Sequence, residues 1–323
     1  MIYAIQVGVN EMKIAFWDNQ LCVRGTTVAL FDYAYYNQTI LGNESIIMYD
    51  TTKDHTVEAV VDKFKKHFKV IGVTDFSQVD PILVAEKCDV IYVIEGGYRT
   101  DLVSKVCKTL THCVFTCGVP HGTVYSAIGA WVPENNGKYP VVPHMINLPD
   151  IADDWRKELG IPQSATVFGR HGGAEQFDIG YVQRTVYDIA RTHPHIYFLL
   201  MNTHRFCPPL PNIIHVAPVV SLVEKAKFIN TCDAMLHARS EGEIFSLSMG
   251  EFASRNKPVF CTRMGSDGHI HLMGDRAFWY TESTLLDMLV SFDKSVECRK
   301  DWNTYKEYTP EKVMAVFKEV YLS

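Results

Sequence analysis

The stretch that decides the fold runs from Ser240 to Phe260 and reads "SEGEIFSLSMGEFASRNKPVF". Two glutamates, Glu243 and Glu251, stand in it with seven residues between them. The preceding run "DAMLHAR" is apolar and opens with an aspartate, and "NKPVF" ends the helical pattern before another apolar run. Strand, polar loop, helix and strand in this order predict an α/β unit with acids at the loop and in the helix.

The two acids have two explanations. In a capping box, Ser248 would be the N-cap of the helix and Glu251, three residues later, would satisfy a second free backbone N–H. This explanation leaves Glu243 and the neighbouring Glu241 without a role. In the second explanation, the acids on both sides of the helix start face a bound ligand.

The rest of the chain repeats the alternation of strand, loop and helix in two halves. In the first half, "MKIAFWD" (residues 12–18) predicts a strand, and the spacing in "VALFDYAYYNQTIL" predicts a helix after the loop "NQLCVRGTT". In the second half, "ATVFGR" (residues 165–170), "HGGAEQFD" and "IGYVQRTVYDIART" follow the same order. Further strands are predicted at "SIIMYD", "CDVIYVIEGG", "CVFTCGVP", "IYFLLMN", "IIHVAP" and "KPVFCT". Buried runs that alternate with helices predict two parallel sheets with helices on both faces.

A proline-rich segment, "PENNGKYPVVPHMINLPD" (residues 133–150), separates the halves. Residues before proline are driven out of the helical region, so the segment should be extended. We therefore predict an α/β fold with two Rossmann-like domains, residues 1–145 and 146–305, that face a central cleft. Residues 306–323 should form a C-terminal helix that can pack back on the first domain. Ligands of such sheets bind beyond the carboxyl ends of the strands.

Composition argues against several classes of function. With 31 Lys and Arg against 37 Asp and Glu, the net charge of −6 offers no basic field for nucleic acid. The lysine cluster "KFKKHFK" (residues 63–69) alternates with apolar residues at helical spacing, which predicts a solvated helix face rather than a membrane anchor. No apolar run reaches the roughly 18 residues that a membrane span needs, and peripheral membrane contact stays open.

Cysteine usage and the spacing of possible ligands predict a cytoplasmic protein without a metal. The nine cysteines lie in apolar stretches and form no Cys-x-x-Cys pair, as expected of buried thiols in a reducing compartment. "HIH" (residues 269–271) has metal-ligand spacing on a strand but no further ligand beside it, which favours a surface or site-lining loop. Because no Asp-x-Asp pair occurs to hold Mg²⁺ or Mn²⁺, we expect neither a metal nor a cofactor.

Two glycine loops and two cationic side chains stand near predicted strand ends. Gly25 in "RGTT" and Gly172 in "GRHGG" would let the backbone approach an anion at a helix start, unless both are tight turns without a ligand. Neither loop is a GxGxxG or Walker motif, which argues against a dinucleotide cofactor or an ATPase. Arg170 ends a strand, where a guanidinium can bind a diphosphate with two parallel hydrogen bonds. His121 follows a strand of the first half and is either functional or structural.

The segment "EIFSLSMGE", preceded by "SEG" and followed by "ASRNKPVF", resembles the E-x7-E signature of the retaining glycosyltransferases of family 4, which have the GT-B fold. Three further stretches resemble the same family: "CGVPHGT" its N-domain strand with a histidine, "VVPHMINLP" its interdomain segment and "GRHGG" the first loop of its C-domain. The resemblance covers most of the chain. It implies a metal-independent retaining glycosyltransferase that moves a sugar from a UDP- or GDP-sugar to a glycan, lipid or other hydroxyl acceptor.

The resemblance also implies roles for individual residues. Glu243, His121 and Arg170 would be catalytic: Glu243 contacts the transferred sugar, His121 touches the donor sugar and Arg170 neutralises the diphosphate. Glu251 would accept hydrogen bonds from the ribose hydroxyls of the nucleotide. The other donor-binding residues would be Ile244, Phe245, Ser246, Leu247, Gly25 and Gly172.

Two departures from the family pattern bear on this prediction. Gln176 stands where the family has a lysine about six residues after the loop arginine, so a departing diphosphate loses one cation. Arg205, Arg239 or Arg263 could substitute for it. Ser246 replaces a family glycine and should narrow the donor pocket. Two alternatives stay open: a sugar-nucleotide epimerase or hydrolase on the same fold, and a GT-B-like protein that binds a nucleotide or glycan without turnover.

Overall fold

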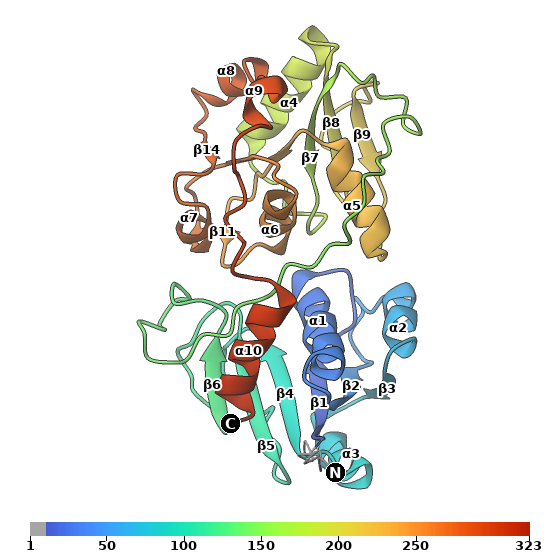
Figure 1. The fold of residues 1–323 in the computed structure, drawn as a ribbon, viewed down its shortest axis with the longest axis vertical. Coiled ribbons are helices and arrows are strands. Elements are labelled where there is room, and N and C mark those ends of the chain that lie inside the picture. The colour runs from blue at the N-terminus through green and yellow to red at the C-terminus, as the bar shows by residue number, and fades with distance from the viewer. Residues whose placement is uncertain (1–10) are drawn as a thin grey trace, which may run out of the picture.

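The computed structural model describes residues 11–323 and consists of two α/β halves stacked along the longest axis (Figure 1). Residues 1–10 of the predicted first domain lie outside the described residues. Each half contains one six-stranded sheet, and the paired strands within both sheets are parallel. The prediction of an α/β fold with two parallel sheets is confirmed.

The first sheet has the strand order β3-β2-β1-β4-β5-β6. Its strands are β1 (Lys13–Asp18), β2 (Glu44–Asp50), β3 (Lys69–Val73), β4 (Val90–Glu95), β5 (Lys108–Cys113) and β6 (Val124–Ala127). The helices of this half are α1 (Gly25–Thr39), α2 (Glu58–Lys65) and α3 (Val79–Glu86), with the 3-10 turn η1 (Phe76–Gln78) before α3. The central strand β4, "VIYVIE", is buried at every position, as expected where both faces of a parallel sheet are covered.

The second sheet has the order β14-β12-β10-β7-β8-β9. Its strands are β7 (Thr166–Arg170), β8 (Ile196–Met201), β9 (Ile213–Val216), β10 (Ala234–Leu236), β12 (Val259–Cys261) and β14 (Phe278–Trp279). The main helices are α4 (Gly180–Thr192), α5 (Leu222–Thr231), α6 (Leu247–Ser254), α7 (Gly268–Met273), α8 (Leu285–Val290) and α9 (Lys294–Glu297). A small parallel pair, β11 (Gly242–Glu243) with β13 (Ser266–Asp267), lies outside this sheet.

Counted within its own half, each sheet has the doubly wound order 3-2-1-4-5-6. In such sheets the order reverses between the first and fourth strands, and the crevice beyond their carboxyl ends is where ligands bind. The reversal falls between β1 and β4 in the first half and between β7 and β10 in the second. Arg170 is the last residue of β7, which places it at this point.

The last helix, α10 (Pro310–Tyr321), returns from the second half and lies on the first (Figure 1). Phe317 is fully buried, with its ring centroid 5.5 Å from that of Tyr33 on α1 and 5.7 Å from that of Tyr92 on β4. Tyr321 is hydrogen-bonded to Ser126 on β6. The last helix of the chain is therefore part of the core of the first half.

Two local predictions are wrong. The run "CVFTCGVP" was expected as a strand, but β5 is the preceding "KTLTHC", and the apolar run forms the loop after it. Three polar residues of β5, Thr109, Thr111 and His112, are fully buried because β5 lies between two other strands of the sheet. The ring of His112 is hydrogen-bonded to the hydroxyl of Tyr92 at 2.6 Å. "HIH" is not on a strand or in a loop but in helix α7, where His269 is buried.

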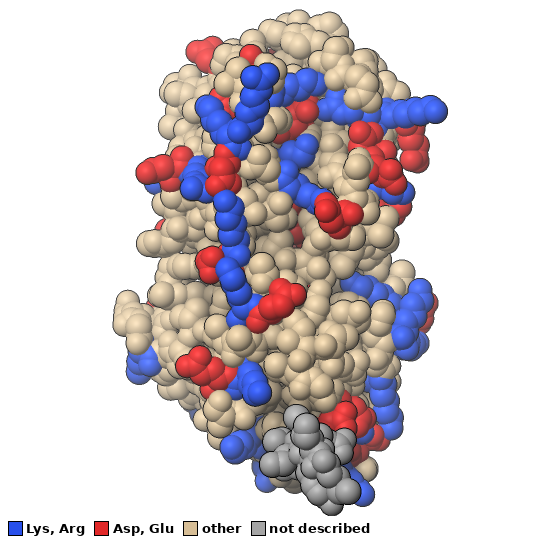
Figure 2. Space-filling view, in the orientation of Figure 1, with Lys and Arg blue, Asp and Glu red and all other residues tan. Residues whose placement is uncertain are grey.

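Acidic and basic side chains lie side by side on the face shown in Figure 2, over the part that the described residues form. Neither sign of charge dominates a continuous area of that face. Among the described residues, no helix is both long enough and apolar enough to cross a membrane.

Candidate active site

The loop between β10 and α6 lies against the first half of the chain. The indole N–H of Trp131 donates a hydrogen bond to the carbonyl oxygen of Ile244. The Phe245 ring centroid lies 5.4 Å from that of His144. Across the same boundary, a Cβ placed on Gly25 would lie 3.6 Å from the Leu247 side chain. The structure thus brings the predicted donor residues Ile244, Phe245, Leu247 and Gly25 together where the halves meet.

Glu243 is held in place by a tight backbone pairing and by two cationic or polar neighbours. Gly242 before it has a φ of 67°, and a Cβ there would meet the Ser266 carbonyl oxygen at 2.3 Å, so only glycine allows β11 to pair with β13. The Glu243 carboxylate accepts hydrogen bonds from His237 Nε2 at 3.0 Å and from Arg239 at 3.3 Å. This gives Arg239 the role of a partner for Glu243.

The surroundings of Glu243 keep its carboxyl group ionised. Burial alone would raise its pKa, but the hydrogen bond from His237 and the charge of Arg239 hold the pKa below the usual value. His269, whose pKa is lowered by burial, accepts the backbone N–H of Glu243 on Nδ1 and bonds the Thr262 carbonyl through Nε2. His269 is therefore a neutral ring that orients Glu243. Among residues 11–323 no three His, Cys, Asp or Glu side chains are grouped to hold a metal ion.

The capping box expected for Ser248 and Glu251 is not present. The N-cap of α6 is Ser246, which has a φ of 55° and accepts the N–H of Met249 on its side chain. Ser246 therefore closes the start of the helix, and Glu251 lies further along it with its carboxylate turned to other partners. The first explanation for the two acids is overturned because the left-handed conformation of Ser246 starts the helix two residues earlier than expected.

Glu251 is buried in an ion cluster beneath the cleft. Lys225 on α5 donates to its Oε1 at 2.7 Å, and His171 Nε2 lies 3.0 Å from Oε2 without the alignment of a hydrogen bond. Burial opposes ionisation, but Lys225 and His171 outweigh it and lower the pKa of Glu251 to about 2. The pKa of His171 is itself lowered by burial.

Arg170 braces the loops around it. Its guanidinium donates to the Asn202 carbonyl at 2.9 Å, to the Thr203 hydroxyl at 2.7 Å and to the Gly173 carbonyl at 2.6 Å. Burial lowers its pKa to about 10, which still leaves it charged at neutral pH. Gln176, at the position of the family lysine, accepts the backbone N–H of Gly173 at 3.0 Å and closes the same loop.

His121 lies apart from the other predicted residues. Its Nε2 is 2.8 Å from a carboxylate oxygen of Glu95 and 3.2 Å from the Thr100 hydroxyl, and its Nδ1 bonds the Val119 carbonyl at 2.7 Å. It lines a cavity of about 900 Å³ that is formed by residues of the first half alone. The structure therefore groups His121 with Glu95 and Thr100, whereas Glu243, Glu251 and Arg170 belong to the second half.

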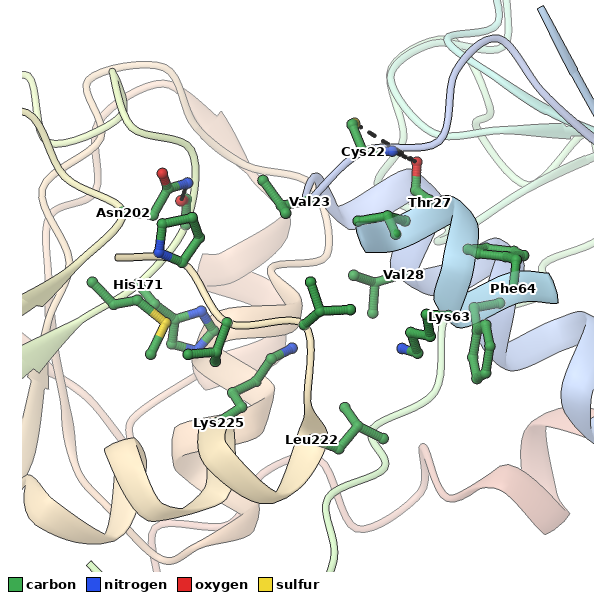
Figure 3. A pocket seen from close by; sticks show the side chains of 17 residues that line it. Cys22, Val23, Thr27, Val28, Lys63, Phe64, His171, Asn202, Leu222 and Lys225 are labelled. Carbon is green, nitrogen blue, oxygen red and sulfur yellow. Dashed lines mark hydrogen bonds between the residues drawn. The ribbon is translucent and has the colours of Figure 1, made fainter. Parts of the chain in front are cut away.

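A cavity of about 80 Å³ lies between the halves (Figure 3). Lys63 of α2 and Lys225 of α5 extend toward one another across it, with His171 beside Lys225 (Figure 3). Gly172, Asn202 and the start of α1 complete much of its wall. The full set of lining residues is Cys22, Val23, Thr27, Val28, Phe31, Val60, Lys63, Phe64, His171, Gly172, Met201, Asn202, Pro218, Val219, Val220, Leu222 and Lys225.

Three of these cavity residues were not predicted as site residues from the sequence. Lys63 was expected on a solvated helix face, and its neighbours Lys65 and Lys66 are indeed exposed, but Lys63 is partly buried and lines the cavity. His171 stood inside the glycine loop "GRHGG" and could have been found there. Lys225 carries no local signal, because it becomes a site residue only through its contact with Glu251 in the fold.

No family model and no curated protein matches the sequence. Solved structures match over nearly the whole chain. A glycosyltransferase from Rickettsia africae ESF-5 has a TM-score of 0.69 at 12% identity and covers 96% of this chain and 99% of its own. HepE from Anabaena, solved in complex with UDP and glucose, has a TM-score of 0.68 at 13% identity, with 96% and 98% covered. The fold is GT-B.

A third solved structure that matches the chain is named for a different activity. A Listeria monocytogenes protein proposed to be a UDP-N-acetylglucosamine 2-epimerase has a TM-score of 0.62 at 9% identity and covers 96% of both chains. At these identities the likeness concerns the fold. The fold places the cavity and the loop from Glu243 to Leu247 between two Rossmann-like halves, and the chemistry has to be argued from the residues there.

Proposed function

We propose that this chain is a metal-independent retaining glycosyltransferase of the family 4 type, with a UDP- or GDP-sugar as donor and a hydroxyl group as acceptor. One observation carries the proposal. Glu243 and Glu251, both held ionised, stand on either side of the loop and helix start that touch the first half. Carboxylates at this spacing can accept hydrogen bonds from the hydroxyls at the two ends of a sugar nucleotide.

Each part of the loop has a matching part of the donor. A carboxylate has about four acceptor sites, so Glu251 has capacity for ribose hydroxyls beside Lys225 and His171. At the start of α6, Ser246 accepts the N–H of Met249, while the N–H groups of Leu247 and Ser248 have no acceptor within the helix and could face an anion. Glu243, with a side chain 16% exposed, would then contact the hydroxyls of the transferred sugar.

The reaction follows from this placement. The bond between the sugar C1 and the diphosphate oxygen breaks, and the acceptor oxygen forms a new bond to C1 on the same face. The departing diphosphate takes the proton from the acceptor hydroxyl. Arg170 would fix the conformation of the loop of Gly172 and Gly173 that faces the diphosphate. The reaction would take place in the cytoplasm, where the nine free cysteines stay reduced.

Donor binding requires the halves to part. The cavity of about 80 Å³ is smaller than the roughly 300–1,000 Å³ of typical ligand pockets. One contact between the halves, the ion pair of Arg24 with Glu175 at 3.4 Å, is half exposed on both sides. Such exposed pairs contribute about 0–1 kcal/mol.

The test is turnover by the purified protein. UDP-glucose, UDP-N-acetylglucosamine and GDP-mannose are each incubated with and without sugar acceptors, and the products are followed by NMR. We expect a new glycoside with the anomeric configuration of the donor, at a rate that EDTA leaves unchanged. An inverted anomer or loss of activity in EDTA would contradict the proposal. An isomerised donor formed without acceptor would identify an epimerase, and binding without any turnover would identify a binding protein.

A further inference from the structure

Lys63 is one of the cations that line the cavity between the halves. Its side chain extends from α2 into the cavity and is partly buried (Figure 3). Within the part of the chain that the structure describes, no carboxylate lies at salt-bridge distance from its ammonium group. The ammonium group lies over the ring of Phe31, whose centroid is 4.0 Å away. A cation placed in this way can accept an anionic ligand without first losing an ion pair.

The cavity as a whole carries surplus positive charge. Lys225 faces Lys63 from the second half, and its ammonium group also forms an ion pair with Glu251 at 2.7 Å. Asp32 on α1 is the other carboxyl group that acts on Lys63, but burial raises the pKa of Asp32 to about 7, so it is only partly ionised at neutral pH. Burial lowers the pKa of Lys63, and the charge of Lys225 lowers it further. A bound anion would reduce the repulsion between the two lysines and would stabilise their charged forms.

Arg170, the arginine of the neighbouring loop, does not line the cavity. Three donors of Arg170 are used by Asn202, Thr203 and Gly173, and Gln176 is neutral. The cations that line the cavity are therefore the two lysines, one from each half. We infer that Lys63 and Lys225 bind the diphosphate of the donor from opposite sides and that the nucleotide thereby joins the two halves. This inference rests on the proposed function and assigns Lys63 a role in donor binding.

The two lysines should distinguish nucleotides by the number of their phosphate groups. Ammonium groups form strong, charge-assisted hydrogen bonds with phosphate oxygens, and a diphosphate offers two phosphoryl groups for two lysines. A nucleoside without phosphate offers none. Affinity should therefore depend on Lys63 most for UDP, less for UMP and not at all for uridine.

The experiment compares K63Q with K65Q by calorimetry. Lys65 lies on the same helix, is exposed and pairs with Glu58 at 3.4 Å, so K65Q removes the same charge from the solvent side. K63Q should bind UDP about 10-fold to 100-fold more weakly than the unaltered protein, the loss expected for one charged hydrogen bond. K65Q should bind UDP as the unaltered protein does, and uridine should bind all three proteins equally.

The outcomes separate this inference from the function on which it rests. UDP binding that K63Q leaves intact would overturn the inference alone, and so would an equal loss for uridine. Absence of UDP and GDP binding in the unaltered protein would overturn the proposed function and the inference with it. A second readout is the melting temperature without ligand. K63Q breaks no ion pair and removes only the contact with the Phe31 ring, so its melting temperature should fall by no more than about 2–4 °C. A much larger fall would show that Lys63 is retained for stability.

Discussion

Replacing Glu251 by glutamine should destabilise the second half, because it leaves the buried charge of Lys225 without a partner. Glu251 is 4% exposed, and its carboxylate forms an ion pair with Lys225. Its pKa falls from 4.5 to about 2 on folding, a change of roughly 2.5 units. At about 1.36 kcal/mol per unit this corresponds to about 3 kcal/mol of stability at neutral pH. The figure agrees with the roughly 3–5 kcal/mol lost when one partner of a buried pair is removed.

The contribution of Glu251 depends on pH in a defined direction. Because its pKa is depressed in the folded state, the stabilisation is fully present above the unfolded value of 4.5 and is lost as pH falls toward about 2. The difference between the unaltered protein and E251Q should therefore be constant from pH 7 to pH 5. It should shrink steadily below pH 4.5.

Urea unfolding at several pH values measures this difference. The matched control is E241Q, because Glu241 is 76% exposed and its pair with Arg239 lies at the surface. Adding K225M to E251Q should recover much of the loss, since an ion pair replaced on both sides by neutral groups leaves no unpaired charge. A loss below about 1 kcal/mol at pH 7, or the same loss at pH 6 and pH 3, would refute the reasoning.

Three further substitutions test other parts of the molecule. If the proposed function holds, E243Q should abolish sugar transfer while UDP still binds in calorimetry, because the ionised carboxylate would contact the transferred sugar and not the nucleotide; full activity would exclude Glu243 from the reaction. H121A should leave UDP affinity unchanged, since His121 lines a cavity made by the first half alone, and a large loss would place it at the nucleotide. F317A should cost about 3–5 kcal/mol in urea unfolding, since the ring is fully buried, and a cost near zero would show that α10 is dispensable.

The sequence predicted the parts of the fold that depend on local pattern. The alternation of apolar runs and helical periods was enough for two parallel sheets. Strand β10, helix α6 and strand β12 follow one another in the predicted order, but Glu243 lies in the short strand β11 and not in a loop. A C-terminal helix was also predicted, and α10 begins at Pro310, a residue that is favoured at a helix start. Strand β5 was displaced because its buried threonines and histidine look polar to any rule based on hydrophobicity.

The partners of the candidate site could not be read from local pattern. Glu251 is paired by Lys225, 26 residues away, and by His171, and these distances close only when β7, α5 and α6 assemble. The N-cap of α6 was misplaced because Ser246 takes a left-handed conformation that is uncommon for serine. Lys63 looked like its solvated neighbours because nothing in the sequence shows that the second half covers that face of α2.

The return of α10 to the first half affects how the protein is made. The sheet of the first half ends at Ala127, but the helix that covers Tyr33 and Tyr92 begins at Pro310. At about 5–20 residues per second, a ribosome needs roughly 10–40 s to synthesise the chain between these points. During that time the face of the first half that contains Tyr33 and Tyr92 is not covered by α10. Its completion depends on α10, so chains that stop before Pro310 should be prone to aggregation.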